Sequence, residues 1–325
     1  MSDTGDASPS HPIGPFGGQA LIEGVMIRGP HSMTIAIRCP DGLILTEAEA
    51  IASPYLLSLR RVPLVRGVVT LYDTFSLGIR ALYRSARIST GREDEPVSRG
   101  EIAVSAATIV AAAAIFFTGP VLLTSWIGRH GSDWFEVIAE GALRLAMLIG
   151  YIWFVGRLPE VKRVFAYHGA EHRTIHAHEH GMSLTPDNVR AFPNEHARCG
   201  TAFLLTVAAL SFVTFTLLGT PSIPERIVER IILTPVIAAV AYEFIRASQA
   251  YESHPLMRAL QQPNLWLQKL TTRDPDDGQI EVAITAMRAA LAAESAFAAG
   301  SEAAPATAPV LVEAESHVEP PQTEI

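Results

Sequence analysis

Histidines cluster in one short stretch of the chain. Six of the eleven lie between residues 167 and 200. In the run Tyr-His-Gly-Ala-Glu-His, His168 and His172 are four residues apart, so on a helix both imidazoles could face one metal ion. Glu171 lies beside them, where a carboxylate can serve as the general base toward a water molecule on the metal. The order His-x-x-Glu-His is that of the inverzincin metalloproteases, although three fixed positions in five also recur by chance.

A second pair of potential ligands precedes a long apolar stretch. The run His-Ala-Arg-Cys-Gly contains His196 and Cys199. Added to His168 and His172, they give a set of nitrogen and sulfur donors that suits Zn²⁺, with a redox iron or another metal as the alternative. We therefore predict a divalent metal site, with Zn²⁺ favoured. A cysteine at the start of an apolar helix is also commonly a small buried hydrophobic residue, which is the alternative for Cys199.

The other histidines of the stretch fit an ordinary polar loop. They are His176, His178 and His180. Glu179 and Glu243 remain candidates for a third or fourth ligand. Glu243 falls in an apolar stretch, where an ionisable group is a functional candidate by default. Its alternative is an ion pair with Arg246 or Arg144.

Long apolar runs position these residues relative to a membrane. A hydrocarbon core about 30 Å thick needs roughly 20 apolar residues in a helix. Residues 102–128 and 199–224 contain no charged residue and meet that test. Residues 137–156 and 227–245 are also apolar but carry charges, among them Glu140 and Arg144, whose spacing allows them to pair. We predict about four transmembrane helices, and the spans lie near residues 102–128, 137–156, 199–219 and 227–245.

Basic residues indicate how such a bundle is oriented. With four spans, 21 of the 25 Lys and Arg residues fall on the side that holds both termini and the loop 157–198. Two spans would place six of these basic residues outside. The positive-inside rule therefore favours four spans, with both termini and the His-rich loop in the cytoplasm.

The remaining segments differ in composition. Residues 1–16 are rich in Pro, Ser and Gly and should be flexible, whereas residues 17–100 contain β-branched runs and a Pro-Asp-Gly turn that predict a small cytoplasmic β unit. Within that segment, residues 64–88 form an amphipathic basic helix that lies on the membrane or packs on the β unit. Residues 248–292 form a cytoplasmic segment, and residues 293–325, rich in Ala, Pro and Glu, should be disordered.

Composition narrows the class further. The chain is 49% hydrophobic and only 18% charged, and six of its eight net negative charges lie in residues 293–325, so nothing favours a nucleic-acid partner. Two cysteines cannot form a disulfide framework, which favours a reducing compartment. We therefore expect an α-helical membrane protein with a small N-terminal β-containing unit.

Five stretches resemble one known family. They are residues 17–30, 66–69, 163–175, 196–201 and 266–277, and they occur in the same order as in the YqhQ family of bacterial membrane proteins. The resemblance covers roughly residues 16–290. It implies a multi-pass protein of the bacterial inner membrane with a suspected metal site, because that family is labelled as predicted metal-dependent enzymes.

The resemblance extends to individual residues. The positions that match in type are His168, Glu171, His172, Glu179, His196 and Cys199. Ala197 departs from the pattern, which has a proline there. The histidines at 176, 178 and 180 do not match it, which favours treating them as bystanders.

Two functions from different classes follow from this reading. The first is a metal-dependent hydrolase at the cytoplasmic face, with Glu171 as general base and a lipid or a membrane protein as substrate. The second is a non-enzymatic regulator or assembly factor whose metal is structural and ties the loop 157–198 to the third span. An open coordination position on the metal separates the two. A small transporter is less favoured, because the chain shows no internal duplication.

Overall fold

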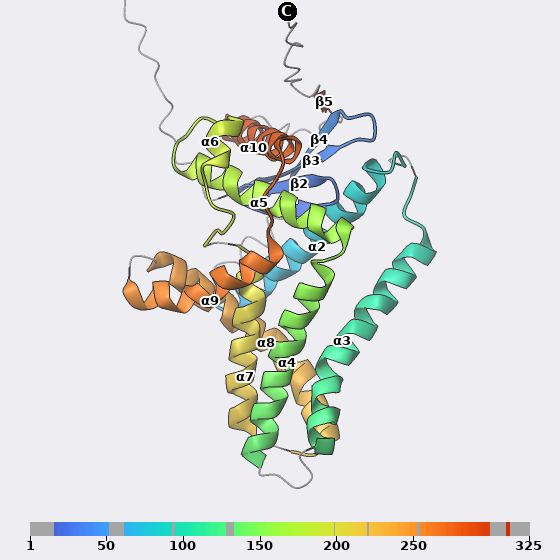
Figure 1. Cartoon of the computed structure of the whole chain (residues 1–325), viewed down its shortest axis with the longest axis vertical. Coiled ribbons are helices and arrows are strands. Elements are labelled where there is room, and N and C mark those ends of the chain that lie inside the picture. The colour runs from blue at the N-terminus through green and yellow to red at the C-terminus, as the bar shows by residue number, and fades with distance from the viewer. Residues whose placement is uncertain are drawn as a thin grey trace, which may run out of the picture.

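The computed structural model describes residues 16–51, 62–92, 95–127, 133–197, 199–219, 221–251, 254–299 and 310–312. These residues form two parts (Figure 1). The head unit contains a β-sheet with helices α5, α6 and α10, and the helix bundle consists of α3, α4, α7 and α8. Helices α2 and α9 lie where the two parts meet.

The head unit is built on an antiparallel sheet. Its strands are β1 (Gly17–Leu21), β2 (Gly24–Arg28), β3 (Ser32–Arg38) and β4 (Ile44–Ala50), paired in chain order. The Pro-Asp-Gly turn joins β3 to β4, with Gly42 at φ 90°, a conformation that glycine adopts without strain. The predicted N-terminal β unit is therefore confirmed.

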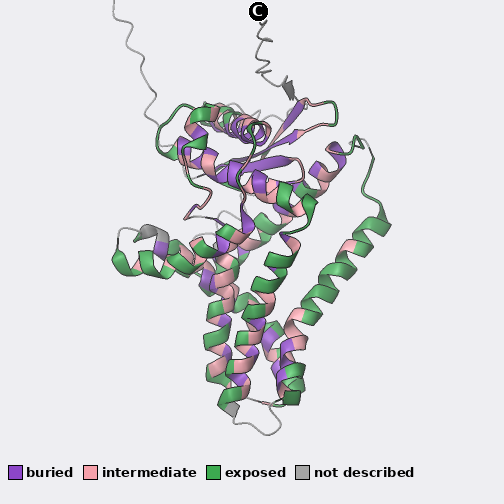
Figure 2. Cartoon of the chain, viewed as in Figure 1, coloured by how far each residue is buried: buried purple, intermediate pink, exposed green. Residues whose placement is uncertain are grey.

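The two faces of the sheet pack against different helices. Because strand side chains alternate, Val25 and Ile27 face α5 (Pro159–Glu179) and α10 (Asp277–Ala298) in one core. Met26 lies in a second core with Leu77 and Ala81 of α2 (Val65–Ile88). Figure 2 shows the buried strands between these helices. The expected amphipathic helix therefore forms and packs on the sheet, where its arginines pair with glutamates of β4.

The C-terminal segment is more ordered than we expected. Helix α10 continues past residue 292, because Glu294 accepts hydrogen bonds from the backbone N–H groups of His31 and Ser32 and from the Ser32 hydroxyl. Strand β5 (Val310–Val312) pairs with β4, with Val312 opposite Ile44. The expectation of disorder from residue 293 onward was wrong for these two segments. The rest of the tail and residues 1–15 lie outside the described residues.

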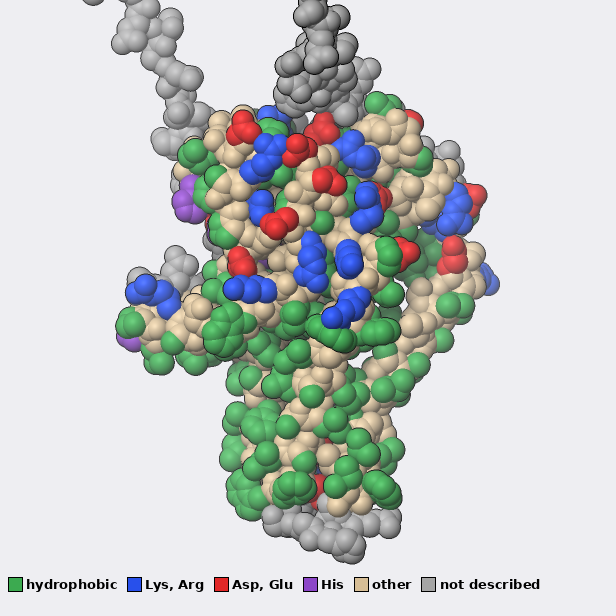
Figure 3. Space-filling model, in the orientation of Figure 1, with side chains coloured by type: hydrophobic (Ala, Val, Ile, Leu, Met, Phe, Trp, Pro, Cys, Tyr) green, Lys and Arg blue, Asp and Glu red, His purple; other side chains and the backbone are tan. Residues whose placement is uncertain are grey.

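The helix bundle contains the apolar stretches. Its helices are α3 (Arg99–Ile127), α4 (Asp133–Val155), α7 (Thr201–Leu218) and α8 (Ile223–Ala250). Within the described residues, α3, α4 and α8 are long and apolar enough to cross a membrane, and α7 is a shorter apolar helix. Hydrophobic side chains cover the bundle and basic ones gather on the head unit (Figure 3). The chain thus has the apolar helices of a membrane protein, whereas the fourth span and the orientation stay predictions.

Charged residues inside the bundle are paired. Glu140 on α4 accepts hydrogen bonds from Arg144 at 2.9 Å and from Arg230 of α8 at 3.0 and 3.2 Å, so the expected pairing of Glu140 with Arg144 is present. Glu243, for which we considered a functional role or an ion pair with Arg246 or Arg144, pairs instead with Arg66 of α2. The reason is that α2 packs along α8 and brings a guanidinium to Glu243 from far along the chain.

Candidate metal centre

Helix α5 turns one face toward the segment that precedes α7. The stretch 157–198, expected as a His-rich loop, is largely helical, with α5 followed by the short α6 (Pro186–Arg190). Residues four apart share a face of a helix, so His168, His172 and His176 form a row along α5. Residues 191–197 return beside this row, and Cys199 lies against it.

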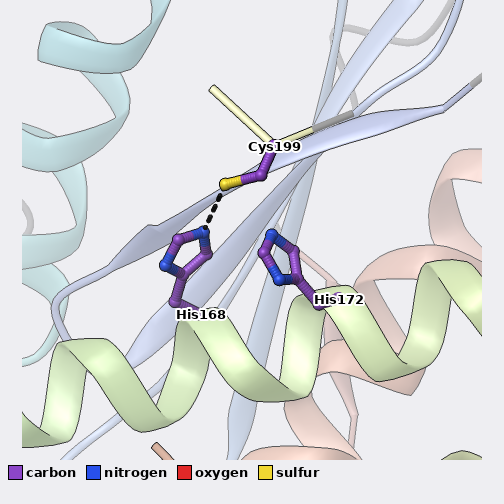
Figure 4. A group of neighbouring side chains, drawn as sticks. All are labelled: His168, His172 and Cys199. Atoms are coloured by element: carbon purple, nitrogen blue, oxygen red, sulfur yellow. Dashed lines mark hydrogen bonds between the residues drawn. The ribbon is translucent and has the colours of Figure 1, made fainter. Parts of the chain in front are cut away.

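His168, His172 and Cys199 converge on one point (Figure 4). Their ligand atoms all lie within 4.8 Å of one another, and the Nε2 atom of His168 is 3.3 Å from the Cys199 sulfur. The two imidazole rings are 4.3 Å apart between centroids. We refer to these three residues as the first group.

Backbone carbonyls fix the orientation of both imidazoles. The Nδ1 atom of His168 is 2.9 Å from the Thr271 carbonyl oxygen, and that of His172 contacts the Asn194 carbonyl oxygen. A carbonyl oxygen only accepts hydrogen bonds, so each Nδ1 carries the hydrogen and each Nε2 keeps its lone pair. Histidines that bind metals are held in this way. Burial lowers the pKa of His172 well below its usual value, which keeps the ring in the neutral form that a metal requires.

The local structure around Cys199 favours its thiolate. The Thr201 N–H group donates to the Cys199 sulfur at 3.4 Å, and the Thr201 hydroxyl lies 3.1 Å from it. Cys199 also precedes the N-terminus of α7, where the helix dipole is positive. Both features stabilise negative charge on sulfur, which is the form that binds metals.

Glu171 lies behind the first group and is only 2% exposed. Its Oε2 atom is 3.6 Å from the Nε2 of His172 and 3.9 Å from that of His168, and it has no hydrogen-bond partner among the described residues. Burial raises the pKa of this carboxyl to about 8; the electrostatic influence of the neighbouring His168 opposes the increase and that of Cys199 adds to it. A buried carboxylate oxygen without a hydrogen-bond partner among the described residues, close to two imidazole nitrogens, fits a cation between them.

Two glycines allow the site to be this compact. A Cβ atom on Gly18 of β1 would lie 2.4 Å from the Glu171 Oε1 atom, and one on Gly169 would lie 2.2 Å from the Arg273 carbonyl oxygen. Both distances are shorter than any side chain can adopt. Glycine at 169 thus costs helix propensity but lets the chain after α9 (Pro255–Thr271) approach α5, which places the Thr271 carbonyl beside His168.

The structure divides the four predicted ligands between two groups. His196 lies with His176 and Glu179, whose ligand atoms are also within 4.8 Å of one another. We refer to these three residues as the second group. The Nε2 of His196 is 3.2 Å from a Glu179 oxygen, and the ring centroids of His196 and His172 are 5.7 Å apart.

The remaining histidines have different surroundings. His176, which we expected in a polar loop, belongs to the second group, and its position four residues after His172 is the sequence signal for that placement. His178 contacts Phe16 edge-on and His180 lies against Phe192. Neither belongs to a group of potential ligands among the described residues.

Glu23 connects the sheet to α5, a role that the sequence pattern did not indicate. It lies in the turn between β1 and β2 at φ 53° and accepts hydrogen bonds from Arg163 at 2.6 Å and from the Tyr167 hydroxyl at 3.2 Å. The Arg163 guanidinium holds the pKa of Glu23 below its usual value. This contact fixes the turn of α5 that precedes His168.

Comparison with known proteins places the chain in a family. Residues 62–293 match the family described as "Protein of unknown function (DUF1385)". The chain is 31% identical over 302 residues to "Uncharacterized protein YqhQ" of Bacillus subtilis (strain 168), which covers 88% of this chain and 95% of that protein. No solved structure matches the chain. The protein therefore belongs to the DUF1385 family, as a relative of YqhQ.

Proposed function

We propose that this protein is a membrane-bound, metal-dependent hydrolase whose metal is held by the first group. The observation that carries the proposal is the geometry of His168, His172 and Cys199, with both imidazoles turned by carbonyl contacts so that Nε2 faces the sulfur. Two neutral imidazoles and a thiolate are a donor set that suits Zn²⁺.

Three protein ligands leave a position for water and substrate. A Zn²⁺ ion bound there would supply a Lewis acid that activates a water molecule for attack on a carbonyl or phosphoryl group. Glu171 would then hold the proton that such a water releases on Oε2, the atom that faces both Nε2 atoms. Gly18, which has no Cβ atom, leaves room for Oε1 of this carboxylate.

The substrate class follows from the position of the site. Cys199 immediately precedes the apolar helix α7 of the bundle, so the first group lies where the head unit meets the bundle. A lipid or a membrane protein reaches this position from the bilayer. The excess of basic residues on the head side supports a cytoplasmic location for the head unit in the bacterial inner membrane.

One observation favours a structural metal instead. His172 and Glu171 are each only 2% exposed, and a closed site with Glu171 as fourth ligand would tie the segment before α7 to α5 without chemistry. In that case the protein is a non-enzymatic regulator or assembly factor. The two functions differ in what the Glu171 carboxylate does.

Metal analysis of the detergent-purified full chain tests the site. We expect stoichiometric metal in the wild type and in the control His178→Ala, whose ring contacts Phe16 rather than the first group. His168→Ala and His172→Ala should each lose one ion per chain. Equal metal content in all four proteins would overturn the proposal.

Glu171→Gln then separates the hydrolase from the structural role. If Glu171 is the base, the variant keeps its metal while the rate falls by about 10²- to 10⁴-fold, which we would read by complementation of a deletion strain. If Glu171 is a ligand, the variant loses metal and function together. Normal metal content with full complementation would refute the hydrolase.

A further inference from the structure

We propose that the second group, formed by His176, Glu179 and His196, is a separate site for a divalent first-row transition-metal ion. It extends the row of histidines by one helical turn beyond the first group and shares no residue with it. The ligand atoms of the three residues lie within 4.8 Å of one another. The inference does not depend on hydrolase activity.

The donor atoms are arranged for a cation. The Nε2 atom of His176 lies 2.9 Å from the Glu195 carbonyl oxygen, so Nε2 carries the hydrogen and Nδ1 is the nitrogen that has the lone pair. The His196 Nε2 atom and a Glu179 oxygen are 3.2 Å apart, and the rings of His176 and His196 are 4.4 Å apart between centroids. Two imidazole nitrogens and a carboxylate oxygen suit borderline divalent ions such as Zn²⁺, Fe²⁺ or Mn²⁺.

The backbone at His196 is held rigidly. The Gln268 side chain of α9 accepts from the His196 N–H at 2.8 Å and donates to the His196 carbonyl at 3.0 Å. Gln268 is fully buried, so both bonds form away from water. This pair fixes the position of His196 opposite the last turns of α5, which is the preorganisation that a metal ligand needs.

The two groups differ in chemistry and in access. His172 and His176 are four residues apart, which corresponds to about 6 Å along the helix. Two ions that share a bridging oxygen lie only about 3.5–4 Å apart. The ions of the two groups would therefore be bound independently. The second group lacks sulfur. Glu179 is exposed, while Cys199 and His172 are buried, so an ion in the second group exchanges with solvent more readily than one in the first.

Cobalt titration of the full-length protein in detergent distinguishes the sites. A thiolate ligand gives Co²⁺ a sulfur-to-metal charge-transfer band, and a nitrogen and oxygen site does not. We expect the chelator-treated wild type to bind two Co²⁺ per chain, of which one produces that band. Glu179→Gln and His176→Ala should bind one Co²⁺ and keep the full band, while Cys199→Ser should bind one and lose the band.

His180→Ala is the matched control. This variant removes the histidine that lies four residues after His176, at the C-terminal cap of α5, and it should still bind two ions. One ion per chain in the wild type together with the full band, or two ions in both Glu179→Gln and His176→Ala, would overturn the inference. Because Glu179 is at the surface, its variant is expected to fold. If the wild type binds one Co²⁺ without the charge-transfer band, the first group fails and the second group still binds its ion. The two sites can therefore fail independently, and the experiment tells which one does.

Discussion

Gln268 provides a direct test of how the site is held together. Its amide is the partner of both the N–H and the carbonyl of His196. Leucine has a similar size but neither donor nor acceptor, so Gln268→Leu leaves two buried backbone groups without partners. Each such group costs about 1–3 kcal/mol. We therefore expect the free energy that holds residues 194–199 against α9 to fall by about 2–6 kcal/mol.

Hydrogen exchange with mass spectrometry measures this loss where it occurs. A decrease of about 2 kcal/mol in the free energy of local opening corresponds to roughly 30-fold faster exchange, so the peptide that contains residues 194–199 should exchange at least that much faster in Gln268→Leu. Thermal unfolding of the purified protein should show a lower midpoint as well. Both measurements are made without metal, so they test the fold independently of the proposed sites.

Gln261 offers a matched control on the same helix. Its side chain donates one partly buried hydrogen bond, 3.3 Å long, to the Ser248 carbonyl. Gln261→Leu should cost about 1 kcal/mol or less and leave exchange at residues 194–199 unchanged. Wild-type exchange and unfolding in Gln268→Leu, or equal effects of the two variants, would show that the His196 segment is held by something other than this amide.

Two further predictions concern ion pairs. Glu140→Leu removes the carboxylate shared by the buried Arg144 and Arg230 and should destabilise the bundle by about 3–5 kcal/mol. Arg230→Met should recover part of the loss, and Glu229→Gln, at the half-buried second partner of Arg230, should cost little. A change below about 1 kcal/mol on chemical unfolding of Glu140→Leu would contradict this. Arg163 lowers the folded-state pKa of Glu23 from 4.5, so the stabilisation is present above that pH and is lost as the pH falls through the lowered value. Glu23→Gln should therefore be less stable at pH 7 by up to about 1 kcal/mol, and the difference should disappear in acid; an equal difference at both pH values would refute the role of the charge.

Local patterns predicted the elements well. The apolar spacing of residues 64–88 gave the limits of α2 to within one residue, and the Pro-Asp-Gly turn marked the connection between β3 and β4. Such features depend on neighbours within a few residues, so sequence alone contains them. The three residues of β5 were missed because a run this short in a tail rich in Ala and Pro carries no signal without its partner strand β4.

Contacts between distant segments could not be predicted in the same way. Glu243 has Arg246 within its own helix, yet it pairs with Arg66, which is 177 residues away. Likewise, spacing on α5 indicated that His168 and His172 share a face. That His196 and Cys199 belong to different groups depends on where α9 places Gln268, which holds His196. A pattern within one element cannot report where another element docks.

The position of the first group between elements determines which variants are informative. His168 and His172 belong to the head unit, whereas Cys199 leads into the bundle, so an ion held by all three would connect the two parts whether or not it is catalytic. Loss of either histidine would therefore destabilise this junction under both proposed functions, and stability measurements alone would not separate them. Glu171 differs, because its Oε2 atom has no hydrogen bond to lose among the described residues. Replacing this carboxylate by an amide removes the base while the surrounding contacts stay in place, and that makes Glu171→Gln the variant that discriminates between chemistry and structure.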